Sequence, residues 1–255
     1  MTLTFTPLPQ MPLIYPGDNL PDLLLAALQT ARVTLDDGDI LVVAQKIVSK
    51  AEGRMVNLTT VTPSKEALEL AKRSEKDPRL VELILSESKE VLRVRPGTII
   101  VEHRLGFVCA SAGIDHSNVR GTSGNPEDWV LLLPEDPDHS ALEIRRRIKV
   151  ATGNRIGVLI IDSHGRAWRL GTIGTAIGIS GLPGVVDERG WQDLFGYRLK
   201  ITTVAAADEL AAAASLVMGE AAEGIPAVHV RGFPYPLRES SLRELIRSKK
   251  NDMFR

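Results

Sequence analysis

The sequence predicts a protein that mixes helices and strands. Short apolar runs rich in β-branched residues, at 40–44 and 158–161, are typical of buried strands. Other segments place apolar residues at helical spacing, and two of them begin with a residue–proline pair, Thr62-Pro63 and Asp77-Pro78, that is typical of a helix start. Both kinds of element are therefore expected to contribute to the core.

The order of elements follows from these patterns. We expect helices at 22–31, 62–74, 77–88, 138–152 and 208–218. We expect strands at 40–44, 98–102, 106–110, 158–161, 200–205 and 227–231. The remaining segments are an extended proline-rich start (1–17), a polar stretch (45–54), a mobile loop (120–129), an irregular segment (184–197) and a charged tail (239–255) that docks as a helix or frays.

Composition narrows the class of protein. The chain has 255 residues, of which 44% are hydrophobic and 25% charged, and its net charge is −1. These values favour a soluble cytoplasmic enzyme or binding protein over a partner of nucleic acid or of an anionic membrane. The sequence also contains no apolar run of spanning length and no signal-peptide pattern. The single cysteine, Cys109, excludes an intrachain disulfide.

The stretch 157–181, GVLIIDSHGRAWRLGTIGTAIGISG, is the centre around which the chain is organised. Its apolar run ends on Asp162, and a polar turn at 163–166 and recurring glycines follow. An acid at the end of a buried strand is held rigidly, and glycine lets backbone N–H groups approach an anion. The stretch can therefore supply a cation site and a phosphate site. It is equally typical of an aspartate that caps a turn beside glycines that merely permit tight bends.

Known catalytic motifs are missing from the sequence. It contains no Walker-type phosphate loop, no G-x-G-x-x-G, no H-E-x-x-H and no G-x-S-x-G, and its five histidines are scattered. His116 and His164 follow candidate acids by one or two residues, and we expect surface side chains there, with metal ligands as the alternative. Three carboxylates in turns at or near the ends of elements remain: Asp115, Asp162 and Glu220. Oxygen ligands of this kind select Mg²⁺ or Mn²⁺ over zinc.

Five strings of residues then carry a resemblance to a known family. They are MPLI (11–14), VVAQKIVSKAEGR (42–54), AGIDHSNV (112–119), IDSHGRAWRLGTIGTAIGISG (161–181) and MGEAAEGIPAV (218–228). In this order, they closely resemble coenzyme F420:L-glutamate ligase, also called F420-0:gamma-glutamyl ligase, over about residues 8–247.

The resemblance implies a fold and an activity. It implies an α+β fold of two intertwined domains, with mixed sheets and flanking helices, in a homodimer. The interleaved subdomains are expected at about 1–95 with 200–255, and at about 96–199.

The implied reaction joins L-glutamate to the lactyl carboxylate of coenzyme F420-0, a deazaflavin phospholactate. GTP is the co-substrate, and further glutamates can be added through γ-linkages. It implies two divalent cations, Mg²⁺ or Mn²⁺, with K⁺ as an additional candidate. The C-terminal reductase domain of some members is not expected.

The resemblance also implies roles for individual residues. Asp115 and Asp162 match the ligands of one cation, and Ser163 and Glu220 match those of the other. The positions that match nucleotide contacts are Met11, Pro12, Leu13, Ile14, Gln45, Lys46, Lys50, Asn118, Met218, Gly219, Ala221, Ala222, Glu223, Gly224 and Ile225. Gln45-Lys46 stands where some members have Ser-Thr, and Ser163 stands where some have Thr, so a polar oxygen is kept at both places.

A reaction route follows as a hypothesis. The γ-phosphoryl group of GTP would activate the lactyl carboxylate as an acyl phosphate, which the glutamate amine attacks. Lys50 would face a phosphate, and Arg166 and Arg169 are candidates for binding a substrate carboxylate or phosphate, or else form structural ion pairs. No general base is evident. Two other functions remain open. The protein could be a non-catalytic carrier of a nucleotide or deazaflavin, or an amide ligase that acts on a different phospho-acid. In the second case only the acceptor pocket would differ, and the loop at 120–129 is a candidate for that difference.

Overall fold

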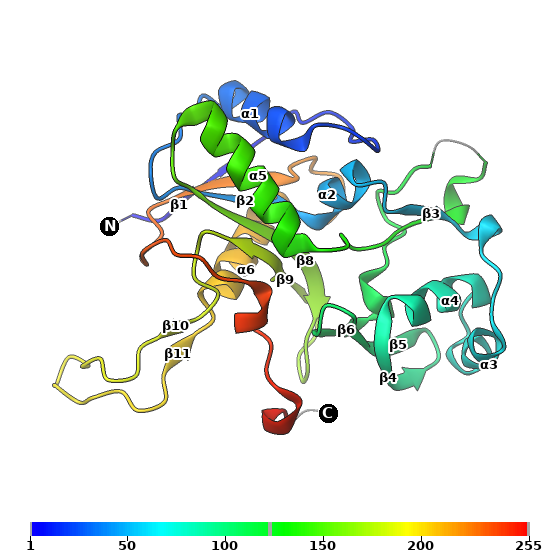
Figure 1. Cartoon of the computed structure of the whole chain (residues 1–255). Coiled ribbons are helices and arrows are strands. Elements are labelled where there is room, and N and C mark those ends of the chain that lie inside the picture. Colours follow the sequence, from blue (N-terminus) through cyan, green and yellow to red (C-terminus); the bar gives the residue numbers. More distant parts are fainter. Residues whose placement is uncertain (1, 122–123, 254–255) are drawn as a thin grey trace.

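A mixed five-stranded sheet lies at the centre of the computed structural model, which describes residues 2–121 and 124–253 (Figure 1). Across the sheet, the strands are β1 (Thr4–Pro7), β12 (Ala227–Arg231), β2 (Ile40–Ala44), β8 (Gly157–Gly165) and β9 (Thr172–Ser180). β2 and β8 run parallel, whereas the other neighbouring pairs are antiparallel. The expected α+β class is therefore confirmed.

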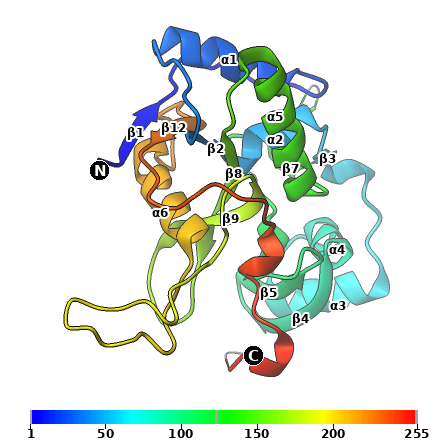
Figure 2. The ribbon, with the colours of Figure 1, turned by 60° about the vertical axis from the view of Figure 1, so that its left-hand side comes forward.

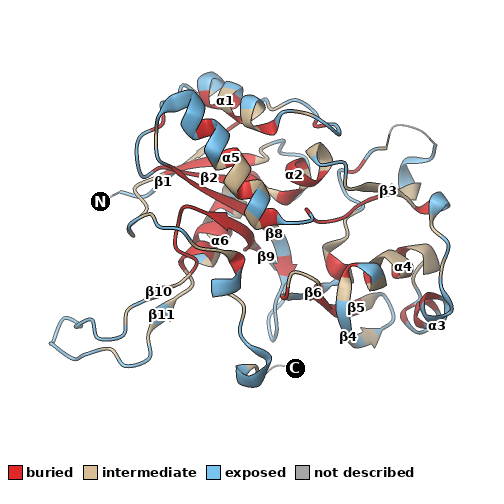
Figure 3. Ribbon diagram, in the orientation of Figure 1, coloured by how far each residue is buried: buried red, intermediate tan, exposed pale blue. Residues whose placement is uncertain are grey.

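Helices cover both faces of this sheet. On one face lie α1 (Leu20–Thr30), α2 (Gln45–Ala51) and α5 (Pro137–Thr152), and on the other lies α6 (Ala206–Met218). Successive side chains of a strand point to opposite faces, so Leu41 and Val43 of β2 join the first core, and Ile40 and Val42 join the second. Apart from the edge strand β1, the strands are accordingly buried along most of their length (Figure 3).

A second, smaller body lies beside the central sheet (Figures 1 and 2). Its antiparallel sheet consists of β4 (Ser88–Arg95), β5 (Thr98–His103) and β6 (Val108–Ala110). The helices α3 (Lys65–Ser74) and α4 (Pro78–Ser86) pack on one face of this sheet, in a core that includes Val81, Ile84, Ile99 and Val101. A two-stranded pair, β3 (Met55–Asn57) with β7 (Trp129–Leu131), carries the chain into and out of this body.

An arm projects from the central body at residues 188–202 (Figure 2). A short antiparallel pair, β10 (Val186–Asp187) with β11 (Thr203–Val204), forms its base. The C-terminal segment forms two 3-10 turns, Leu242–Glu244 and Lys249–Asn251, in place of the expected helix or frayed end. No helix in residues 2–121 or 124–253 is long and apolar enough to cross a membrane.

The central sheet joins strands from both parts of the expected division into subdomains. That division would separate β8 and β9 from the three other strands of the central sheet, yet β8 pairs along its length with β2. The second body is drawn from about residues 55–131. How the chain divides into units that fold independently stays a prediction.

The stretch 157–181 differs most from the expected secondary structure, because its first strand is longer than expected. β8 does not end at residue 161 but continues to Gly165, because Asp162, Ser163 and His164 pair with β9. The turn lies at 166–171 instead of 163–166. The strand therefore carries the acid in its interior.

Two of the recurring glycines serve packing. Gly174 and Gly178 lie within β9, where a Cβ would stand 2.4 Å from the Ala211 carbonyl oxygen and 2.4 Å from the Pro137 carbonyl oxygen, respectively. Their missing side chains let α6 and α5 approach the sheet. This close packing of helices on the sheet was not among the roles expected for these glycines, and a role in binding an anion stays a prediction.

Smaller differences concern element ends. α3 begins at Lys65, because the Ser64 hydroxyl accepts the backbone N–H of Ala67 and so replaces Thr62 as the N-cap. α4 ends at Ser86, two residues earlier than expected, and the expected strands at 106–110 and 200–205 are shortened to β6 and β11. Within the loop expected at 120–129, Pro126–Asp128 form a 3-10 turn, and residues 122–123 lie outside the described part of the chain.

Candidate active site

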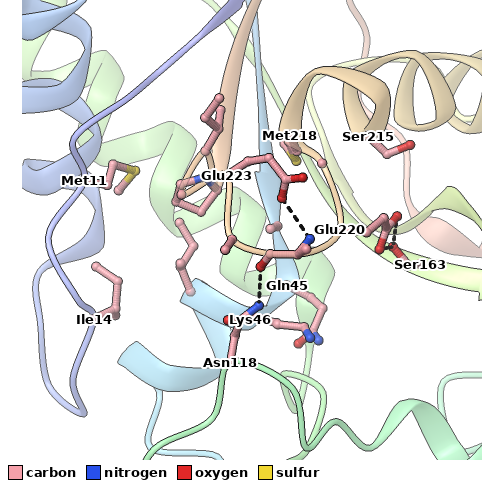
Figure 4. Close-up of a pocket in the computed structure, with 18 of the residues that line it drawn as sticks. Met11, Ile14, Gln45, Lys46, Asn118, Ser163, Ser215, Met218, Glu220 and Glu223 are labelled. Carbon is pink, nitrogen blue, oxygen red and sulfur yellow. Dashed lines mark hydrogen bonds between the residues drawn. The ribbon is translucent and has the colours of Figure 1, made fainter.

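A cavity of about 440 Å³ opens at the end of the central sheet where β2 meets α2 (Figure 4). Residues 11–14 line one side, and residues 161–163 of β8 and the loop after α6 line the other. β2 and β8 are parallel, so Gln45 and Asp162, which directly follow paired residues Ala44 and Ile161, come to the same edge. Ligand sites of α/β sheets commonly form at this edge. All the positions matched to nucleotide contacts line this cavity.

Asp115 is tied to the first turn of α2. The Gln45 side-chain amide donates to Asp115 Oδ2 at 2.7 Å, and Lys46 Nζ lies 3.3 Å from Asp115 Oδ1. Gln45 is itself fixed, because its Oε1 accepts the Ser49 hydroxyl at 2.9 Å. The loop that carries Asp115 is thereby placed next to the cavity, although it is distant in sequence.

Asp162 and His164 form a buried pair on β8. Their Oδ2 and Nε2 atoms are 3.0 Å apart, which is possible because residues two apart on a strand share a face. Burial alone would raise the pKa of Asp162, but the hydrogen bond and the charge of His164 lower it below its usual value. Asp162 is therefore held as a carboxylate.

The half-buried aspartates Asp115 and Asp162 interact unfavourably. Burial raises the pKa of Asp115 to about 6, and the charge of nearby Asp162 adds to this rise, while Lys46 and Gln45 oppose it. Carboxylates that share a site repel each other, and a cation between them would relieve this repulsion. The donor chemistry thus fits a hard cation.

Ser163 points to the opposite side of β8 and meets the loop after α6. Its hydroxyl is 2.7 Å from Glu220 Oε1 and 2.9 Å from Oε2 (Figure 4). Of the four residues matched to cations, Ser163 and Glu220 are therefore in direct contact, whereas Asp115 and Asp162 affect each other through their charges.

These pairs are not complete metal sites by themselves. In the described part of the chain, no group of three or more His, Cys, Asp or Glu side chains is arranged to hold an ion. Mg²⁺ in phosphate-transfer sites is commonly held by one or two carboxylates, with phosphate oxygens and water as the other ligands. Two oxygen pairs beside a cavity fit that arrangement.

Two lysines bring positive charge to the cavity. Lys50 Nζ donates to the Asn118 carbonyl oxygen at 2.7 Å, and Lys46 Nζ donates to the Ser117 hydroxyl at 2.7 Å. The Asn118 amide in turn donates to the Ala221 carbonyl oxygen at 2.9 Å. Burial and the neighbouring Lys46 lower the pKa of Lys50. An anion bound between the two lysines would offset the repulsion between their charges.

The loop at 218–225 closes the cavity opposite α2 (Figure 4). Gly219 has φ 74° and ψ 177°, a backbone conformation that is essentially restricted to glycine. The Glu223 carboxylate accepts the backbone N–H of Ala221 at 2.8 Å, which stabilises the turn. The end of α6 and the loop conformation together place Glu220 against Ser163.

Arg166 and Arg169 are not brought to this cavity. Both lie in the turn between β8 and β9, and Arg166 donates to the Gly171 carbonyl oxygen at 3.1 Å. Arg166 lines a second cavity on the other side of this hairpin, whereas Arg169 is exposed and lines neither cavity. Their role toward a substrate stays a prediction.

His164 is the site residue that the sequence interpretation placed wrongly. It was expected at the surface, but its side chain is buried against Phe107 and bonded to Asp162. The available signal was its two-residue spacing from Asp162, which indicates a shared face once the strand extends past residue 161.

Comparisons with known proteins agree with this site. The sequence pattern of the F420-0:Gamma-glutamyl ligase family matches residues 9–232. A coenzyme F420:L-glutamate ligase of Methanothermobacter thermautotrophicus is 49% identical over 247 residues, which cover 96% of each chain. Proteins of the same name from Methanopyrus kandleri and Archaeoglobus fulgidus are 46% and 44% identical, and each match covers 100% of this chain and 98% and 97% of theirs.

These matches define the protein as a ligase. The chain belongs to the F420-0:gamma-glutamyl ligase family.

Proposed function

We propose that this protein is a GTP-dependent ligase that joins L-glutamate to the lactyl carboxylate of coenzyme F420-0, and then adds further glutamates through γ-linkages. The names of the relatives supply the acceptor and the amino acid. The observation that supports the proposal best is one cavity lined by the lysines of α2, the acids Asp162 and Glu220, and the loop after α6. Carboxylate oxygens and ammonium groups on one cavity suit a nucleotide phosphate chain.

The proposed reaction has two steps. The lactyl carboxylate attacks the γ-phosphorus of GTP, so that GDP leaves and an acyl phosphate forms. The glutamate amine then attacks the acyl carbon, inorganic phosphate leaves, and the amine loses a proton as the amide forms. Phosphoryl transfer depends mainly on positioning and on neutralising charge.

Particular residues would perform this work. Lys46 and Lys50 place two positive charges where the phosphates would lie, and the 218–225 loop with residues 11–14 would enclose the nucleoside. Asp115 with Asp162, and Ser163 with Glu220, would hold two divalent cations, Mg²⁺ or Mn²⁺. When bound, such cations would neutralise phosphate charge and orient the γ-phosphoryl group.

We also propose a homodimer. The arm at 188–202 exposes the large apolar side chains Trp191, Leu194, Phe195, Tyr197 and Ile201. Several apolar side chains on one projecting segment typically mark an interaction surface. A second copy of the chain is the partner that the family resemblance favours.

The activity is tested by mass spectrometry of the products. The protein is incubated with F420-0, glutamate and Mn²⁺, with GTP, ATP or no nucleotide. The proposal predicts the mono-glutamyl amide with GTP and none without nucleotide. Binding of GTP without any amide would indicate a carrier, and product formed only from another phospho-acid would indicate a ligase of different specificity.

A further inference from the structure

A second cavity, of about 650 Å³, lies between the small sheet, the β8–β9 hairpin and the C-terminal segment. The helices α3 and α4 cover one face of the small sheet, where Ile99, Val101 and Cys109 are buried. Ile100 and Val108 point to the opposite face and line the cavity. Its volume falls within the range of about 300–1,000 Å³ that is typical of small-molecule sites.

The lining combines an apolar surface with three arginines and two acids, namely Arg93, Arg166, Arg247, Asp208 and Asp252. Ile100, Phe107, Val108 and Ala110 provide an apolar wall, and Arg166 stands at the turn of the β8–β9 hairpin. An apolar wall suits a flat aromatic ring system, and a guanidinium group binds phosphate or carboxylate through two parallel hydrogen bonds. The cavity therefore suits an aromatic molecule that carries an anionic tail.

This second cavity adjoins the nucleotide cavity through β8. The ring centroids of Phe107, on its wall, and His164 are 5.1 Å apart, and His164 Nε2 is 3.0 Å from Asp162 Oδ2. Asp162 and Ser163 line the nucleotide cavity, and Gly165 and Arg166 line the second one. At about 3.3 Å per residue along a strand, one extended molecule can reach from one cavity to the other.

We propose that the second cavity binds the acceptor of the ligation, a fused aromatic ring system with a phosphorylated acid tail. The ring lies against Ile100 and Val108, the tail phosphate is held by Arg166, and the terminal carboxylate reaches the nucleotide cavity past the end of β8. This assignment rests on the proposed function, because a ligase needs an acceptor site beside its nucleotide site.

The test compares two valine-to-tryptophan variants. Val108→Trp fills the second cavity, whereas Val150→Trp adds the same side chain at an exposed position of α5 that lines neither cavity. Equilibrium dialysis measures the Kd for F420-0 without GTP, and steady-state kinetics measures the KM for GTP. We expect Val108→Trp to raise the Kd for F420-0 by at least about tenfold while the GTP KM stays within about twofold, and Val150→Trp to match the wild type.

Circular dichroism checks whether Val108→Trp folds. A second pair of variants keeps the test valid if it does not. Arg166→Glu reverses the charge at the cavity, and Arg147→Glu makes the same change on the exposed side of α5. Only the first should weaken F420-0 binding.

The outcomes separate this inference from the proposed function. An unchanged F420-0 affinity in Val108→Trp and Arg166→Glu overturns the acceptor site, even if the wild type ligates with GTP. A changed sedimentation coefficient with unchanged F420-0 affinity also overturns it, and indicates that a second copy of the chain covers this face. If the wild type binds F420-0 and Val108→Trp does not, but no GTP-dependent amide forms, the acceptor site stands and the proposed function fails.

Discussion

The Ser163 hydroxyl lies within 2.9 Å of both carboxylate oxygens of Glu220, although 57 positions separate the two residues in sequence. Ser163 is fixed by the pairing of β8 with β9, and Glu220 by the end of α6 and the Gly219 turn. The contact therefore depends on how the sheet and α6 pack. It brings one of the two proposed oxygen pairs to the edge of the nucleotide cavity.

A double-mutant cycle tests whether this pair acts as a unit. Ser163→Ala and Glu220→Gln should each lower ligation by about 10- to 100-fold, and the double variant should be little worse than the poorer single variant. The Ser140–Glu52 hydrogen bond, which joins α5 to the end of α2, provides a matched control. Ser140→Ala and Glu52→Gln should leave the ligation rate within about twofold of the wild type. Additive losses at Ser163 and Glu220 would show that the two residues act separately.

Glycine at position 174 is expected to be essential for the packing of α6. In Gly174→Ala, the new Cβ would meet the Ala211 carbonyl oxygen at 2.4 Å and Ser215 Cβ at 2.7 Å, so α6 must shift. Overpacking of this kind typically costs about 1–3 kcal/mol, which denaturant unfolding measures. Gly165→Ala is the control, because a Cβ there has no neighbour within 4 Å. Equal stability of the two variants would contradict the packing role.

Glu87 links the two bodies of the protein and should make their stability depend on pH. Its carboxylate accepts hydrogen bonds from Arg54 at 2.9 Å and from Arg104 at 2.8 Å. Burial alone would raise its pKa, but neighbouring His103, Arg104 and Arg54 lower it to about 2, from an ordinary value of 4.5. Because the pKa is lowered on folding, the stabilisation is complete above pH 4.5 and is lost as the pH falls toward 2.

The variant Glu87→Gln should therefore lose about 2–3 kcal/mol of stability at neutral pH. The difference from the wild type should shrink between pH 4.5 and 2. Thermal unfolding over this range measures it, with Glu69→Gln on the exposed side of α3 as the control. A difference that stays constant across the range would show that Glu87 stabilises the protein by packing alone.

The exposed arm supports a prediction about assembly. Leu194 and Phe195 are 97% and 94% exposed, so glutamate at either position should leave the fold of one chain intact. If the arm packs against a second copy, each change places a charge in an apolar contact and converts dimer to monomer. Sedimentation velocity measures this, with Leu216→Glu, at an exposed position of α6, as the control. A monomeric wild type would refute the dimer itself.

Local sequence signals predicted the elements that local chemistry determines. The β-branched run at 40–44 is β2 over the same residues, and Asp77 caps α4 with its side chain, as the Asp77-Pro78 pair indicates. β4 was missed because its sequence, SKEVLRVR, carries charges at positions exposed on the small sheet, and so lacks the apolar run of a buried strand. Gln45–Ala51 was left as a polar stretch, since a helix that directly follows a strand leaves no turn residues to mark its start.

The site was predicted from family resemblance more than from local patterns. The cavity joins segments as distant as residues 11–14, Asp162 and Glu220, and no periodicity indicates that these meet. The role of the glycines in β9 depends on α5 and α6, which cross the sheet at Gly178 and Gly174. The burial of His164 likewise depends on Phe107 of the second body. Contacts between distant segments are therefore the part that the sequence alone did not provide.

The central claim is that the carboxylate of Asp162 serves GTP-dependent ligation. The most direct measurement is the rate of glutamyl-F420-0 formation by Asp162→Asn, with Asp22→Asn on the exposed side of α1 as the control. The substitution removes one negative charge at nearly constant volume, and the amide oxygen can still accept a hydrogen bond from His164. We predict a loss of at least about 100-fold in Asp162→Asn, with circular dichroism and thermal unfolding close to those of the wild type. A folded Asp162→Asn protein that forms the amide at the wild-type rate would contradict the account.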